Sequence, residues 1–171
     1  MTTEFRLEIY YEHDSDQEFA QREKQKLCTL VSEIAPHIQL KTKVLKAKTI
    51  DKIDNYFYNG RYFNLRLHDP EEAGSQTLLI TNDDVRAEGF TYGQRGCLDK
   101  QKMEGKQRRG ENSADITIHE WLHTIAGKQI GGRILPCPDD PKGLEFECKD
   151  INGKVHWHYW YKYILDMIPD C

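Results

Sequence analysis

The stretch "NSADITIHEWLHTIAG", Asn112–Gly127, decides the interpretation of the whole chain because it combines a helical pattern with two histidines and a glutamate at close spacing. Its apolar residues recur at helical spacing, at Ile116, Ile118, Leu122 and Ile125. Asn112 or Ser113 can cap the first turn, and Gly127 is a typical residue to end a helix. We therefore predict one helix that carries the string H-E-x-x-H.

This string places three chemically active side chains on one helix. His119 and His123 are four residues apart, so both project from the same face and can bind one zinc ion. Glu120 is one step round the helix, where its carboxylate can reach a water on the metal without binding the metal. The pattern predicts metal-assisted hydrolysis, with Glu120 as the general base.

A catalytic zinc needs a third protein ligand, and the residues downstream offer several. We favour His158 in "VHWHYWY", because it lies where the chain enters a last helix and imidazole is a common zinc ligand. Asp139 in "CPDD" is the alternative ligand. Further candidates are Asp140, Glu145, Glu147, Cys97, Cys137 and His156. Tyr161, three residues after His158, is the candidate donor to a developing oxyanion.

The segments before the motif helix predict a sheet. "FRLEIYYE", "KTKVLKAKTI", "QTLLITND" and "VRAEGFTYG" have the composition or alternation of strands. A helix follows Ser15 and Glu18, a capping-box pair, and stops at Pro36. Residues 50–67 are ambiguous: a short helix, a turn at Asn59–Gly60 and an extended piece. The basic run in 96–110 indicates a solvated loop.

The segments after the motif helix predict a part rich in loops. "KQIGGRILPCPDDPKG" is rich in glycine and proline, and a hairpin is expected around Asn152–Gly153. "WHYWYKYILDMI" closes the chain as a helix. The predicted fold class is α/β (α+β): residues 1–171 form a single domain, in which a small mixed sheet precedes the motif helix.

Composition limits the classes of partner. The chain has 171 residues and a formal net charge of -4, so no concentrated basic surface indicates nucleic acid. No apolar run is long enough for a membrane span, and the first residues lack the pattern of a signal peptide. The five cysteines are odd in number and include no C-x-x-C pair, which favours reduced thiols over a disulfide framework, with a Cys137–Cys148 bridge as the alternative. We expect a cytoplasmic protein with no nucleic acid and no membrane as partner.

"HEWLHTIAG", preceded by the predicted strands, resembles the upper half of a zincin metallopeptidase. His119 and His123 match the family's zinc ligands, and Glu120 matches its general base. The resemblance covers about 76–163 and implies that an edge strand, here 85–93, binds peptide by strand addition. The extended metzincin motif is absent: glycine comes one residue late, at Gly127, and Gln129 occupies the third histidine position. Nor do the further motifs of gluzincins and aspzincins follow. Together with "WHYWY", the stretch also resembles small bacterial zincin-like proteins.

The leading functional hypothesis is a zinc-dependent metallopeptidase that hydrolyses peptide bonds. Its restraint would come from a regulatory protein partner or from narrow specificity for a protein or peptide substrate. The alternative hypothesis is a non-catalytic zincin-like binding module with a structural zinc. Glu120 argues against this alternative, since a structural site has no use for a base beside the metal.

Overall fold

A five-stranded mixed sheet forms the framework of the computed structural model, which describes residues 3–139, 151–152 and 156–169. The strands follow the order β2-β1-β5-β7-β6. Four are parallel, and β6 runs antiparallel to β7. Their bounds are β1 Thr3–Tyr11, β2 Ile38–Lys46, β5 Gln76–Thr81, β6 Gly89–Tyr92 and β7 Arg95–Asp99. The predicted α/β class and mixed sheet are confirmed.

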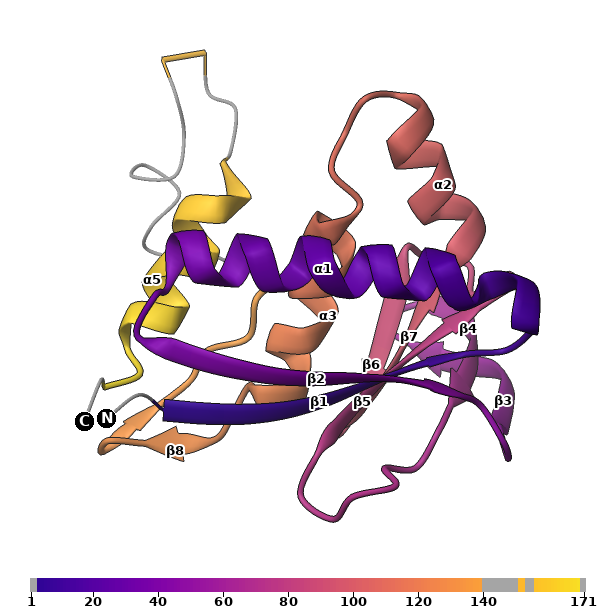
Figure 1. Ribbon diagram of the computed structural model, residues 1–171, viewed down its shortest axis with the longest axis horizontal. Helices are drawn as coiled ribbons and strands as arrows, with labels where there is room; N and C mark the ends of the chain where they lie inside the picture. Colours follow the sequence, from indigo (N-terminus) through magenta and orange to yellow (C-terminus); the bar gives the residue numbers. More distant parts are fainter. Residues whose placement is uncertain (1–2, 140–150, 153–155, 170–171) are drawn as a thin grey trace.

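The main core lies between one face of this sheet and the helices (Figure 1). Those helices are α1 (Gln17–Ile34), α3 (Ala114–Ile125) and α5 (Trp157–Asp166). Alternate residues of β1, such as Leu7 and Ile9, join this core because side chains along a strand alternate between its two faces. Trp121 of α3 is fully buried there, so the face of α3 opposite its histidines anchors the helix to the sheet.

A two-stranded hairpin covers part of the opposite face. β3 (Asp51–Tyr58) pairs with β4 (Arg61–Leu67), and a second core forms around three buried residues, Phe63, Leu65 and Leu67. The prediction of a short helix in this segment is therefore wrong, because these residues form strand β3, whose backbone hydrogen bonds are made with β4. The predicted turn is confirmed: Asn59 and Gly60 both have positive φ, 51° and 79°, as a tight hairpin turn requires.

Strand β6 is the end strand of the sheet, at the side where α3 packs. Its residues alternate between two environments. Thr91 faces α3, where its hydroxyl donates to Glu120, and Phe90 faces the hairpin, where its ring packs on Phe63. In the described part of the chain no strand pairs with the outer edge of β6. The edge strand predicted within 85–93 is thus present.

Two local predictions need correction. The segment predicted as a loop contains β7 and helix α2 (Lys100–Arg108), because the Asp99 side chain caps that helix at the backbone N–H of Lys102 and Met103 anchors it in the core. The capping box at Ser15 is also wrong. A short 3-10 helix η1, Asp14–Asp16, precedes α1, and no side chain caps either element.

The ends of α3 match the sequence pattern. Asn112 Oδ1 accepts from the backbone N–H of Ala114, while Ser113 instead donates to Glu23. Gly127 has a φ of 82° just after the helix, a conformation that favours glycine. The chain then forms a small hairpin, β8 (Gln129–Ile130) with β9 (Arg133–Ile134), before it returns to the histidines. Of the hairpin predicted near the C-terminus, Gly153 lies outside the described residues.

None of the described helices has the length and apolar character needed to cross a lipid bilayer.

Candidate metal centre

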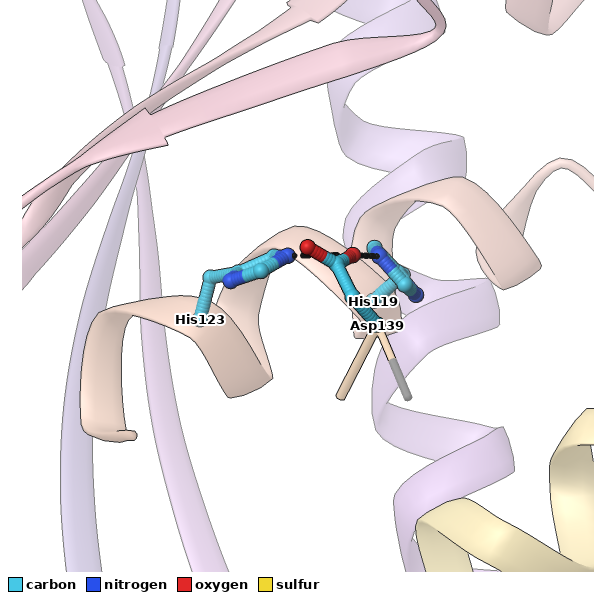
Figure 2. A group of neighbouring side chains, drawn as sticks. All are labelled: His119, His123 and Asp139. Atoms are coloured by element: carbon cyan, nitrogen blue, oxygen red, sulfur yellow. Dashed lines mark hydrogen bonds and ion pairs between the residues drawn. The ribbon is translucent and has the colours of Figure 1, made fainter. Parts of the chain in front are cut away.

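The two motif histidines and Asp139 meet above the half-buried face of α3 (Figure 2). The Nε2 atoms of His119 and His123 both donate to one oxygen, Oδ1 of Asp139, over 2.8 and 2.9 Å. Within the described residues this is the group whose ligand atoms could share a metal, since all of them lie within 4.8 Å of one another. The structure therefore brings the alternative ligand, Asp139, to the motif histidines.

The charges of these three side chains are strongly coupled. Hydrogen bonds from His119 and then His123 hold the pKa of Asp139 far below its ordinary value, so it is a carboxylate. Burial acts to lower the pKa of His123, but the hydrogen bond with Asp139 and the charge of Glu120 outweigh burial and raise that pKa. Negative charge is thus concentrated where the two imidazoles converge, which favours a cation at this point.

The donor set suits zinc. Two imidazole nitrogens and one carboxylate oxygen form a common three-ligand set for a catalytic zinc, which leaves a fourth position open. Ligand atoms about 2.0–2.1 Å from a tetrahedral zinc are about 3.3 Å apart. The Asp139 oxygen lies 2.8 and 2.9 Å from the two nitrogens, slightly closer than this, and all three atoms lie within 4.8 Å of one another. A metal would replace the protons that now lie between the nitrogens and the oxygen. The residues present therefore fit zinc.

Glu120 is enclosed between α3 and the edge strand. Its side chain accepts from the Thr91 hydroxyl over 3.0 Å, and the residue is only 6% exposed. Burial raises the pKa of Glu120, while the charges of His123 and His119 oppose this rise. A carboxylate with a raised pKa beside two metal-ligand candidates has the properties of a general base. Gly89 of β6 leaves room for it, because a Cβ there would lie 2.7 Å from Glu120 Cγ.

The Nδ1 atoms of the histidines have partners of their own. The Tyr161 hydroxyl lies 2.8 Å from Nδ1 of His119, and the Cys137 sulfur lies 3.8 Å from Nδ1 of His123. The structure thus places Tyr161 against the ring of a ligand candidate, on the side away from Asp139. Its predicted role as an oxyanion donor stays a prediction.

His158, the ligand that we favoured, does not join the group. Its Nε2 lies 2.6 Å from Oδ1 of Asp115, one helical turn before His119 on α3. The reason is its place near the start of α5, from which its ring reaches the first turn of α3 at Asp115. The hydrogen bond that the ring donates to Asp115 raises the pKa of His158 and burial opposes this, so the pair is an ion pair when the ring is protonated.

The other ligand candidates divide into described and undescribed residues. Cys97 is buried in β7, and burial raises its pKa to about 12, so it is a neutral thiol. His156 is the residue before α5 and its ring packs on Tyr159. Asp140, Glu145 and Glu147 lie outside the described residues, as does Cys148 of the alternative Cys137–Cys148 bridge.

Three residues near the site, Asp115, Thr91 and Trp160, make contacts that were not predicted from the sequence. Asp115 could have been found from spacing, because it precedes His119 by four residues and so shares its helix face. Thr91 and Trp160 carry no such signal, since their partners, Glu120 and the Pro138 carbonyl, lie far away in the sequence.

Comparison of the chain with protein-family models and with curated proteins gave no match.

Proposed function

We propose that this protein is a zinc-dependent metallopeptidase in which His119, His123 and Asp139 hold the metal and Glu120 is the general base. The observation that carries the proposal is the convergence of two Nε2 atoms on one carboxylate, beside a buried glutamate on the same helix. The zincin resemblance of "HEWLHTIAG" supports the reaction class. Asp139 replaces His158 as the proposed third ligand.

Zinc bound by these residues would lower the pKa of a water molecule and polarise the carbonyl group of a substrate. Glu120 is placed to take the proton from that water and to return a proton to the leaving amine. Its burial supports both steps, since a carboxylate with a raised pKa binds a proton more readily than an exposed one. Thr91 fixes the orientation of the carboxylate by its hydrogen bond.

A peptide substrate is favoured by the position of β6. The outer edge of this strand has no partner strand among the described residues, and the strand packs directly against α3. An extended peptide could pair with that edge and run past Glu120. Cleavage of peptides, rather than of small amides, is therefore the activity to test first.

The test uses the zinc-loaded chain and a library of unstructured peptides, with new termini identified by mass spectrometry. We expect cleavage by the wild type and none by Glu120→Gln, which should keep its zinc. Zinc should be lost on purification in His119→Ala and Asp139→Ala and retained in His158→Gln. Cleavage by Glu120→Gln at the wild-type rate would overturn the proposed base, and zinc retained in Asp139→Ala would overturn the proposed ligand.

The structural-zinc alternative makes a different prediction. A closed structural centre has four protein ligands, whereas the group formed by described residues has three members. If zinc is only structural, Glu120→Gln should change neither zinc content nor any activity. The predicted regulatory partner and cytoplasmic location stay predictions.

A further inference from the structure

We propose that helix α5 is the positioning element of the metal centre, acting through Tyr161, Trp160 and His158. This inference rests on the metal centre of the proposed function. It differs from the ligand role predicted for His158, because none of these three side chains would touch the metal. Tyr161 contacts the ligand candidate His119. Trp160 contacts Pro138, which precedes Asp139 in the chain, and His158 contacts Asp115, one helical turn before His119.

Tyr161 orients His119. Its hydroxyl is 2.8 Å from Nδ1, and Tyr161 is only 3% exposed, so few other geometries are open to this pair. When Nε2 binds a metal, the ring proton resides on Nδ1, which then donates to the tyrosine oxygen. That hydrogen bond fixes both the tautomer and the orientation of the ring.

Trp160 fixes the segment that carries Asp139. Its indole N–H donates to the carbonyl of Pro138 over 3.1 Å, and the ring is buried in the core. Pro138 directly precedes Asp139, so this bond limits the positions that the carboxylate can take. Neighbouring residues of α5 thus hold two different ligand candidates, one on α3 and one on a loop.

His158 sets the alignment of α5 on α3. His158 and Tyr161 are three residues apart on α5, and their partners, Asp115 and His119, are four residues apart on α3. Such spacings put each pair of residues on one face of its helix. The two contacts therefore run side by side in the same order along both helices. A shift of α5 along α3 would therefore disrupt both contacts at once: it would break the His158–Asp115 pair and move the Tyr161 hydroxyl away from His119.

The test measures zinc affinity of the full chain by competition with a chelator, which needs no substrate. We expect Tyr161→Phe to bind zinc about 10–100-fold more weakly, as for other partners of metal-bound histidines. Trp160→Phe and His158→Gln should show smaller losses in the same direction. Tyr163→Phe is the matched control, because Tyr163 lies on the same helix with an exposed side chain, and its zinc affinity should be unchanged.

A second readout separates positioning from general stability. In the cobalt-substituted protein, the visible absorption spectrum should change in Tyr161→Phe and stay unchanged in Tyr163→Phe. A role in packing alone would lower the melting temperature of the metal-free protein and leave affinity and spectrum as in the wild type, which would overturn the inference. Wild type that binds no zinc would overturn the metal centre and this inference together. Zinc binding without peptide cleavage would overturn only the activity.

Discussion

Gly89 leaves the space that the side chain of Glu120 fills. A Cβ at position 89 would lie 2.7 Å from Glu120 Cγ and 2.8 Å from the backbone carbonyl oxygen of Cys97. Both distances are below 3.0 Å, and Cβ atoms in proteins essentially never lie that close to an atom they are not bonded to. The edge strand and the proposed base therefore fit together because this strand position has no side chain.

Gly89→Ala should for this reason displace Glu120 and lower peptide cleavage at least tenfold, with zinc content unchanged. We also expect a loss of about 1–3 kcal/mol in the free energy of unfolding, because a new methyl group overpacks a filled region. Peptide cleavage and chemical denaturation measure the two effects. Gly105→Ala in α2 is the control, since its nearest neighbour would be an arginine side chain 3.4 Å away. Full cleavage activity in Gly89→Ala would contradict the proposed place of Glu120 in the reaction.

Zinc should stabilise the folded protein, because folding brings together the proposed ligand atoms of His119, His123 and Asp139. At a free zinc concentration 100 times Kd, the stabilisation is about 2.7 kcal/mol. For a chain of this size, that corresponds to a rise of roughly 5–10 °C in melting temperature. A thermal melt with zinc and with excess chelator measures the difference. His123→Ala should abolish the rise, and replacement of the exposed His13 by alanine should preserve it.

The ion pair between His158 and Asp115 should make stability depend on pH. Asp115 raises the pKa of His158 above the ordinary value of about 6.5, so folding favours the protonated ring. The stabilisation is complete below pH 6.5 and is lost as pH rises through the folded pKa. The melting temperature of the chelator-treated wild type should exceed that of His158→Gln most at pH 5.5, with the difference shrinking by pH 8.5. A difference independent of pH would show that protonation of His158 contributes nothing.

The capping residue Asp99 connects strand β7 to helix α2. Its two carboxylate oxygens accept from the backbone N–H groups of Lys102 and Val85, each over 3.2 Å. Asp99→Ala should lower the free energy of unfolding by about 1–3 kcal/mol, since it removes a helix cap and a buried acceptor. Asp99→Asn keeps one acceptor oxygen and should cost less. Urea denaturation of both variants tests this, and equal losses would contradict the capping role.

The sequence predicted the elements with strong periodicity and missed those that depend on distant partners. The motif helix and its cap at Asn112 follow from local pattern, because a helix satisfies its backbone hydrogen bonds within itself. Strand β3 was missed since its partners lie on β4, and its own residues also fit a short helix. Helix α2 was hidden by its lysines, although Asp99 could have indicated its start.

The sequence by itself determined two ligand candidates and the proposed base, because His119, Glu120 and His123 belong to one helix whose spacing fixes their relative positions. Only the tertiary structure decided which distant residue joins them. Residues 158 and 139 were both chemically able to do so, and the packing of α5 on α3 turns His158 toward Asp115. The chain that returns through β8 and β9 brings Asp139 to the two imidazoles instead. Spacing along the sequence carries no information about such a contact, since it depends on how separate elements pack.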